Sequence, residues 1–223
     1  MIDKIFAGAD EAVAAVKDGD VVLVGGFGNA GVPEALIEAL VRAGRRGLTI
    51  VSNNCGTGES GLSLLYKNHC VSHAVASFPA QAGNHHFKAA YESGECTLEL
   101  VPQGTMAERM RAAAAGLGGI FTPTGVATEL AEGKETREIE GRTYLFEKPL
   151  RGDVALVMAH LGDRFGNLRH RYTNRNFNPV MAMAARLTIA QVRRVVAPGE
   201  IEPDDVHTPG IFVDRVVEVG DAA

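Results

Sequence analysis

Short runs of β-branched and aliphatic residues alternate with helix-like stretches through the first third of the chain. A buried strand is predicted at Val21–Val24, a helix at Pro33–Val41 and a second strand at Leu48–Val51. Proline suits the first turn of a helix, where its missing N–H would form no helical hydrogen bond. Strands that alternate with helices build βαβ units, whose strands are parallel. The sequence therefore predicts an α/β fold with a mainly parallel open sheet flanked by helices.

The rest of the chain continues this pattern with one interruption. Further strands are predicted at Val71–Ser77, Thr97–Val101, Asp153–Ala159, Leu187–Val196 and Ile211–Val219, and further helices at Phe87–Glu92 and Met106–Ala115. A turn is predicted at Pro102–Gly104, and residues 134–148 are typical of a charged hairpin that turns at Gly141. No internal repeat or long linker divides the sequence, so residues 1–223 are predicted to form a single domain.

Composition and charge exclude several classes of protein. The 223 residues include 22 Lys plus Arg and 27 Asp plus Glu, a net charge of -5, so binding to nucleic acid or to an anionic membrane is not expected. No apolar run approaches the roughly 20 residues of a membrane helix, and the acidic N-terminus lacks the features of a signal peptide. Cys55, Cys70 and Cys96 show no C-x-x-C spacing. We therefore expect a cytoplasmic protein without disulfides and without a metal.

A glycine loop lies between the first predicted strand and the first predicted helix. Gly26–Gly31 matches G-x-G-x-x-G, which in this context is the dinucleotide-binding fingerprint. That fingerprint also needs an acidic residue at the end of the second strand to bind the ribose, but none occurs there before Glu59. An NAD-dependent oxidoreductase is thus an alternative function, but the sequence lacks the ribose-binding acidic residue that it requires. The loop alone fits either backbone N–H groups presented to an anion or a tight turn without a ligand.

Several motifs in the same order resemble a known family. The segment Asp18–Pro33 closely resembles the N-terminal signature of the α subunit of 3-oxoacid CoA-transferases. Further motifs of that subunit match Ser52–Asn54, Leu100–Thr105, Phe121–Gly125, Glu132–Glu135 and Arg175–Pro179. The segment Ala159–Leu168 is more similar to the 3-oxoadipate branch than to the acetoacetate branch. This resemblance runs through nearly the whole chain and implies the α/β fold of such subunits.

The resemblance implies transfer of CoA from succinyl-CoA to a 3-oxoacid through a covalent intermediate. In this family a glutamate attacks the thioester and a glutamyl-CoA thioester follows, which divides one difficult exchange into easier steps. That glutamate belongs to the β subunit, in a Ser-Glu-Asn-Gly motif. This chain has only Gly58–Gly61, with the sequence GESG, so Glu59 is not assigned as the nucleophile. No catalytic residue is expected in this chain.

The same resemblance implies the partner and the substrates. The partner is a β subunit, in a heterodimer or an α2β2 assembly. A CoA thioester is a substrate, and no tightly bound cofactor is expected. The implied acceptor is 3-oxoadipate, an intermediate of aromatic-compound catabolism, with acetoacetate as the alternative. Outside this class, a CoA-binding protein without transferase activity remains an alternative.

Specific residues are implied as binding groups. The CoA-binding segment consists of Gly25, Gly26, Phe27, Gly28, Asn29, Ala30 and Gly31. The side-chain amides of Asn53 and Gln103 line the acyl and carboxylate site. Amides suit this role because they donate hydrogen bonds without adding a carboxylate that would repel the nucleophile. Asn53 also fits a turn at the end of a strand, so a structural role stays open for it.

Four arginines lie close together in the sequence: Arg164, Arg169, Arg171 and Arg175. Because 3-oxoadipate carries one more carboxylate than acetoacetate, one of these arginines is a candidate to bind that distal carboxylate. The alternative is a solvated surface or an interface between subunits.

The histidines and cysteines give weaker signals. His69 and His73 lie four residues apart, but a strand is predicted there, so a shared helical face for a metal is not expected. The adjacent His85 and His86 cannot easily face one site, which favours the surface of a helix N-terminus. Cys55 follows the two asparagines and is a candidate to lie near the site, although buried packing is the more ordinary role.

Overall fold

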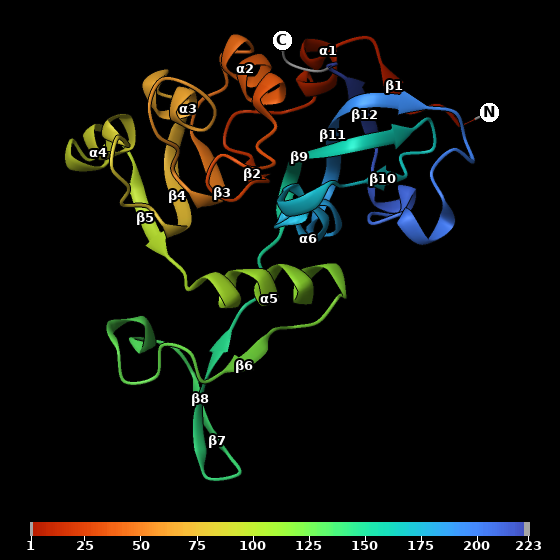
Figure 1. The fold of residues 1–223 in the computed structure, drawn as a ribbon. Coiled ribbons are helices and arrows are strands. Elements are labelled where there is room, and N and C mark those ends of the chain that lie inside the picture. The colour runs from red at the N-terminus through yellow and green to blue at the C-terminus, as the bar shows by residue number, and fades with distance from the viewer. Residues whose placement is uncertain (1, 221–223) are drawn as a thin grey trace.

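A large, mainly parallel sheet forms the body of the computed structural model, which describes residues 2–220 (Figure 1). Its strands are β1 (Ile5–Phe6), β2 (Val21–Val24), β3 (Leu48–Asn54), β4 (Val71–Phe78), β5 (Thr97–Leu100), β9 (Gly152–Asp163), β10 (Leu168–Arg169), β11 (Ala185–Val196) and β12 (Arg215–Glu218). The order is β1-β12-β11-β9-β2-β3-β4-β5, and β10 pairs with β9. Every pairing is parallel except that of β10 with β9. The predicted fold class is confirmed.

Helices cover both faces of this sheet. They are α1 (Ala9–Val13), α2 (Glu34–Arg42), α3 (Ser63–Lys67), α4 (His85–Glu92), α5 (Gln103–Ala114) and α6 (Asn178–Ala184), with short 3-10 helices at Glu129–Ala131, Tyr172–Arg175, Pro203–Asp205 and Gly210–Phe212. Among residues 2–220, no helix combines the length and apolar character that crossing a membrane requires.

The core has two halves because side chains of a strand alternate between the faces of a sheet. Val22 of β2 packs into a cluster with α1 to α4, whereas the next residue, Leu23, packs with Met106 of α5 and Met181 of α6. All four side chains are buried. Strands buried on both faces consist of continuous apolar residues, which is why Val21–Val24 shows no polar alternation.

A second, smaller sheet lies beyond α5 (Figure 1). It contains β6 (Ile120–Thr122), β7 (Thr136–Ile139) and β8 (Arg142–Glu147), in the antiparallel order β6-β8-β7. The hairpin predicted within residues 134–148 is confirmed, and its turn places Glu140 at φ 49° and Gly141 at φ 73°. Two consecutive residues of positive φ match the right-handed twist of a tight hairpin. The third strand, β6, was not predicted, because three residues are too few for a periodic pattern.

A buried ionic cluster joins the small sheet to the main body. The guanidinium of Arg109 on α5 lies 2.6 Å from Glu99 of β5 and donates a hydrogen bond of 2.9 Å to the carbonyl oxygen of Lys148. Glu147 of β8 is buried, 2.6 Å from Lys134 and 3.9 Å from Arg109. Buried charges need partners of opposite sign. These contacts therefore fix the small sheet against α5.

Two predicted segments form a different kind of element in the structure. Residues Gly210–Phe212 form a 3-10 helix, and the last strand begins only at Arg215, so the strand predicted at Ile211–Val219 was wrong in its first half. The predicted turn at Pro102–Gly104 is the start of α5 instead: the Met106 N–H donates to the Pro102 carbonyl oxygen at 2.8 Å. Proline before a helix keeps its carbonyl acceptor, so it begins the helix without opposing it.

We expect Glu147→Ala to lower the free energy of unfolding by about 3 kcal/mol, because the variant loses the buried carboxylate that pairs with Lys134 and lies beside the buried Arg109. The matched control is Glu135→Ala, beside the start of β7, where the Arg137–Glu135 pair is more than half exposed. Loss of an exposed pair costs about 1 kcal/mol or less. Urea unfolding followed by circular dichroism measures both, and equal losses would contradict a joining role for Glu147.

Candidate active site

The segments singled out in the sequence meet at the edge of the main sheet where its parallel strands end. The loop Gly25–Gly31 follows β2, Asn53 lies near the end of β3, and Gln103 begins α5 after β5. Ligands of open α/β sheets bind outside the carboxyl ends of the strands. The topology thus gives residues from distant parts of the sequence a common site.

The glycine loop is a tight turn that admits only glycine at two of its positions. Phe27 and Ala30 exchange two backbone hydrogen bonds of 3.0 Å, which leaves Gly28 and Asn29 at the tip. Gly28 has φ +57°. At Gly25 an added Cβ would lie 1.9 Å from Oδ1 of Asn178. Glycine is required at these positions because of backbone conformation in one case and close approach in the other.

Two asparagines from the segment before and at the start of α6 hold this loop. Asn176 accepts a hydrogen bond from the Gly26 N–H at 3.2 Å and donates to the Ala30 carbonyl oxygen at 3.0 Å. The buried Asn178 donates to the Gly31 carbonyl oxygen at 3.1 Å and accepts from the backbone N–H of strand β9 at 2.9 Å. No role was predicted for either asparagine, although both belong to the segment Arg175–Pro179, which resembles a motif of the family.

Asn53 and Gln103 contact each other directly. Nε2 of Gln103 donates a hydrogen bond of 2.6 Å to Oδ1 of Asn53. Asn53 is buried within β3 and does not lie in a turn, whereas Gln103 is exposed. The bond fixes the orientation of both amides, which a site that directs hydrogen bonds at a reacting group needs.

A cleft of about 660 Å³ opens beside Gln103 and the glycine loop. Phe27, half exposed, contributes to its wall. The lining residues are Phe27, Gln103, Gly104, Ala107, Arg111, Arg175, Asn176, Phe177, Pro179, Val180 and Met183. Asn53 is not among them and contacts the cleft-lining Gln103 from behind the surface. The cleft therefore combines an apolar wall with two cations and two amides.

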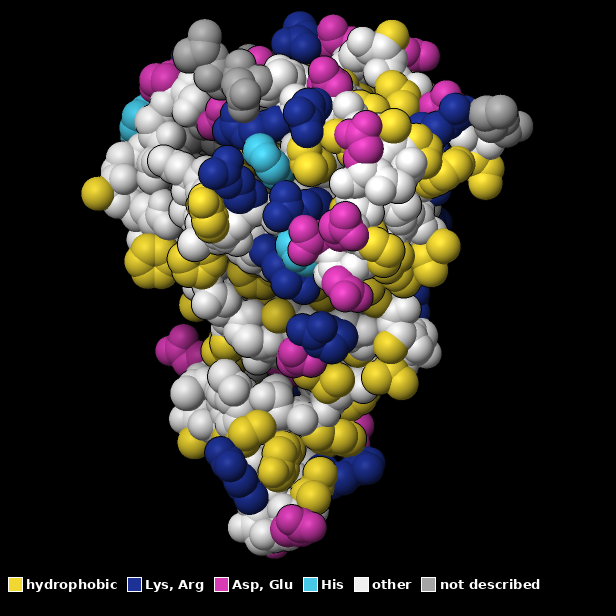
Figure 2. Space-filling model, turned by 45° about the vertical axis from the view of Figure 1, so that its right-hand side comes forward, with side chains coloured by type: hydrophobic (Ala, Val, Ile, Leu, Met, Phe, Trp, Pro, Cys, Tyr) yellow, Lys and Arg dark blue, Asp and Glu magenta, His cyan; other side chains and the backbone are white. Residues whose placement is uncertain are grey.

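The structure separates the four arginines. Arg164 and Arg169 form ion pairs with Asp3 at 3.2 Å and Asp205 at 2.9 Å. The guanidinium of Arg171 lies over the ring of the neighbouring tyrosine, 4.8 Å from its centroid. Figure 2 shows one face of the molecule, on which Lys and Arg side chains run down the middle with Asp and Glu side chains beside them. Of the four, Arg175 is the one that lines the cleft.

Cys55 is fully buried in the core and does not line the cleft. Burial raises the pKa of its thiol to about 12. A thiol with so high a pKa is protonated at neutral pH and is a poor nucleophile. The ordinary packing role is the one the structure supports.

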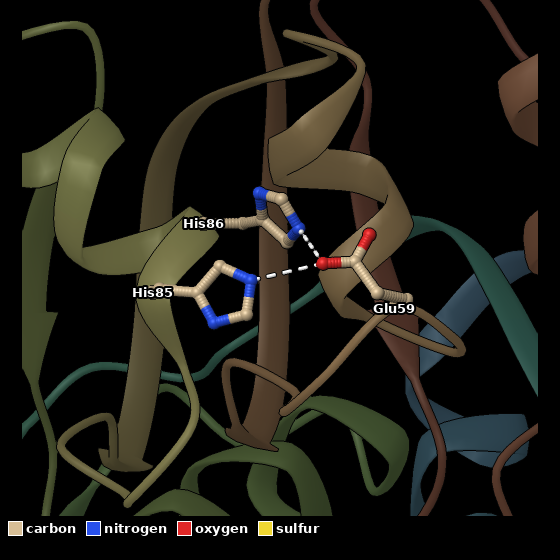
Figure 3. A group of neighbouring side chains, drawn as sticks. All are labelled: Glu59, His85 and His86. Carbon is tan, nitrogen blue, oxygen red and sulfur yellow. Dashed lines mark hydrogen bonds and ion pairs between the residues drawn. The ribbon is translucent and has the colours of Figure 1, made fainter.

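The histidines contact different partners. His69 and His73 bond Glu95 at 2.6 Å and Thr97 at 2.7 Å, so the structure does not bring them together. His85 and His86 begin α4, as predicted, but the expectation that they do not face one site was wrong. Both direct Nε2 at the same carboxylate oxygen of Glu59 (Figure 3). The loop that carries Glu59 can approach both rings because it crosses the N-terminus of α4, which sequence spacing does not reveal.

A buried histidine anchors the segment that leads to Asn176. Nδ1 of His170 lies 3.0 Å from the Met158 carbonyl oxygen, and Nε2 lies 3.0 Å from the hydroxyl of Thr208. Burial lowers the pKa of His170 from 6.5 to about 4, and nearby His207 and Arg175 add to this effect. The ring is therefore neutral at pH 7, which lets one nitrogen donate and the other accept.

Comparison with known proteins identifies the family of this chain. The sequence model of the Coenzyme A transferase family matches residues 6–219. The chain belongs to this family. It is 52% identical over 223 residues to the A-type (α) subunit of 3-oxoadipate CoA-transferase from Pseudomonas putida, covering 100% of this chain and 96% of that protein. It is 42% identical over 215 residues to the A-type subunit of succinyl-CoA:3-ketoacid coenzyme A transferase from Helicobacter pylori, covering 96% of this chain and 92% of that protein.

Solved structures share the fold. Glutaconate coenzyme A-transferase from Acidaminococcus fermentans aligns with a TM-score of 0.85 at 22% identity, over 97% of this chain and 76% of that one. An acyl-CoA transferase from E. coli O157:H7 aligns with a TM-score of 0.85 at 23% identity, over 100% of this chain and 48% of that one. This chain thus spans about half of the E. coli protein. At such identities the likeness concerns the fold alone.

The lowered pKa of His170 predicts a loss of stability in acid. Between about pH 6.5 and pH 4 the unfolded chain binds a proton at this position and the folded chain does not, so the free energy of unfolding falls as the pH is lowered through that window. The slope is at most about 1.4 kcal/mol per pH unit. In His170→Gln this contribution disappears, so the free energy of unfolding of the variant falls less between pH 7 and pH 5 than that of the parent. Urea unfolding at pH 7, 6 and 5 tests this, and an unchanged slope in His170→Gln would contradict it.

Proposed function

We propose that this chain is the α subunit of a two-subunit CoA-transferase that moves CoA from succinyl-CoA to 3-oxoadipate. One observation carries the proposal: the cleft presents amides and two arginines, and no Asp or Glu is among its lining residues in the part of the chain that the structure describes. A transferase that works through a glutamyl intermediate needs a carboxylate nucleophile. That group must come from a second chain. The relatives from P. putida and H. pylori, both named as A-type subunits, support this arrangement.

In the proposed reaction, the β subunit's glutamate attacks the thioester carbon of succinyl-CoA. An acyl-glutamyl anhydride forms and CoA leaves as a thiolate, which then attacks the glutamyl carbonyl and releases succinate. The acceptor carboxylate takes CoA by the reverse sequence of steps. Each attack places negative charge on a carbonyl oxygen, and preorganised donors near that oxygen lower the barrier by several kcal/mol. The CoA thioester is itself the reactive group, so the proposal includes no tightly bound cofactor.

The residues of this chain bind and orient in that scheme. Gly25–Gly31 is proposed as the CoA-binding segment. Its fixed shape, held by Asn176 and Asn178, supports this role because a loop that is already ordered loses little entropy on binding. Asn53 and Gln103 are proposed to bind the acyl and carboxylate groups, and their mutual hydrogen bond supports a preorganised pair.

The positive charge of the cleft supports 3-oxoadipate as the proposed acceptor. 3-Oxoadipate has a distal carboxylate that acetoacetate lacks, and Arg175 and Arg111 both line the cleft. Arginine binds carboxylates through two parallel hydrogen bonds, which gives orientation as well as affinity. Acetoacetate, a shorter 3-oxoacid, remains the alternative acceptor, and the relative from H. pylori is named for a 3-ketoacid without a distal carboxylate being specified. We further place the reaction in aromatic-compound catabolism in the cytoplasm, within a heterodimer or an α2β2 assembly.

The deciding experiment measures CoA transfer from succinyl-CoA to 3-oxoadipate and, in parallel, to acetoacetate. It is performed with this chain alone and with this chain co-purified with its β subunit. Activity only in the mixture supports the proposal, and the preferred acceptor decides between the two acids. Activity of the chain alone would place the nucleophile here and refute the proposed division of the site between two chains. CoA binding without exchange in the mixture would indicate a protein that binds CoA and is not an enzyme.

We expect Arg175→Met to lower kcat/KM for 3-oxoadipate by about tenfold to a hundredfold relative to kcat/KM for acetoacetate. A hydrogen bond to a charged group contributes about 1.5–3 kcal/mol, which corresponds to that ratio. The donor half-reaction is common to both acceptors and cancels in the comparison. The control is Arg164→Met, whose partner Asp3 lies outside the cleft. An unchanged acceptor preference in Arg175→Met would exclude this arginine as the determinant.

A further inference from the structure

A cluster of three metal-ligating side chains lies outside the cleft. Glu59 stands in the loop between β3 and α3, and His85 and His86 are the first two residues of α4. Nε2 of His85 lies 2.9 Å and Nε2 of His86 lies 2.8 Å from Oε1 of Glu59. In Figure 3 both imidazole rings point from the helix toward the carboxylate. None of the three residues lines the cleft, and the proposed transfer reaction does not use them.

The spacing of the ligand atoms fits a small divalent cation. One nitrogen from each histidine and one carboxylate oxygen all lie within 4.8 Å of one another. Zinc binds His nitrogen and carboxylate oxygen at about 2.0–2.2 Å in tetrahedral geometry, so its ligand atoms stand roughly 3.3 Å apart. An ion between the three atoms therefore requires Oε1 of Glu59 to move a few tenths of an ångström away from the two nitrogens, which now lie 2.8 and 2.9 Å from it.

A fourth residue orients the carboxylate. Nζ of Lys67 lies 2.6 Å from Oε2 of Glu59, the oxygen that the histidines do not contact. This bond leaves Oε1 directed at the two rings, in the way that an outer hydrogen bond fixes a ligating carboxylate in metal sites.

The cluster is open to solvent on one side. The side chains of His85 and Glu59 are more than half exposed, whereas His86 is 21% exposed. Three protein ligands with an open side leave a position for water, as in zinc sites that are not closed by a fourth residue. Imidazole with one carboxylate suits zinc and its neighbours in the first transition row better than magnesium or calcium, which prefer oxygen ligands alone.

We propose that Glu59, His85 and His86 form a binding site for one divalent transition-metal ion of the zinc type. The ion joins the loop after β3 to the start of α4, where the Gly58 N–H already donates a hydrogen bond of 2.9 Å to the Gly83 carbonyl oxygen. The end of β3 also contacts the glycine loop, because the Asn54 amide donates to the Gly28 carbonyl oxygen at 3.3 Å. Metal binding thus stabilises a segment adjacent to the glycine loop.

The chain provides a matched control. His69 and Glu95 form another exposed histidine–carboxylate pair, 2.6 Å apart, but they lack the second imidazole. If any surface histidine beside a carboxylate bound zinc, both places would do so equally. If the three-ligand arrangement is required, only the cluster at Glu59 binds.

The test is calorimetric titration of the full chain with zinc chloride, repeated for His85→Ala, Glu59→Gln and the control His69→Ala. We expect one zinc ion per chain in the parent and in His69→Ala, with affinity at least tenfold lower in the other two variants. Cobalt chloride as a second probe gives a visible absorption band in the parent that His85→Ala lacks. Circular dichroism establishes that each variant is folded, and His85→Gln replaces any variant that is not.

Thermal unfolding gives a second readout. A ligand that binds only the folded chain raises Tm in proportion to the logarithm of its concentration above Kd. Zinc is expected to raise the Tm of the parent and of His69→Ala, with little or no rise in Glu59→Gln. The proposal is overturned if the parent binds no stoichiometric zinc, or if His85→Ala and Glu59→Gln bind it as tightly as the parent. Either result would leave the cluster as an ion pair only.

Discussion

The hydrogen bonds between two asparagine side chains and the glycine loop hold the site together. Asn176 and Asn178 bond to backbone groups on both sides of the loop tip, and Asn178 also binds the backbone of the central strand β9. A loop this rich in glycine would otherwise adopt many backbone conformations, because glycine restricts the backbone dihedral angles least. The asparagines convert it into a fixed shape, and they connect it to the segment that carries Arg175 into the cleft.

The sequence was sufficient for the parallel sheet and for its main helices, because continuous apolar runs such as Val21–Val24 and a proline-led helix after the glycine loop are strong local signals. The resemblance to the family also singled out Asn53 and Gln103, whose side chains lie 2.6 Å apart in the structure, and their binding role stays a prediction. The contact itself was not predictable. Residues 50 positions apart in different elements meet only through the order of strands, which no local pattern contains.

Other features were missed for related physical reasons. The convergence of His85 and His86 on Glu59 depends on a loop crossing the end of a helix, and spacing within the helix argues against it. The position of the small sheet against α5 depends on Arg109 and Glu147. Both side chains are buried, whereas charged residues are ordinarily expected at the surface. The roles of Asn176 and Asn178 were missed because their hydrogen-bond partners are backbone atoms. Every residue has such atoms, so no residue type in the sequence identifies the partners.

The position of β9 has a consequence for the order of folding. Strand β2 pairs with β3 on one side and with β9 on the other, and β9 begins roughly 130 residues after β2 ends. At a synthesis rate of about 5–20 residues per second, β2 waits roughly 6 to 26 s for that partner. During this interval the apolar edge of β2 is unpaired, and unpaired edges are templates for association with other chains. The centre of the finished sheet is thus an open edge while the protein is being made.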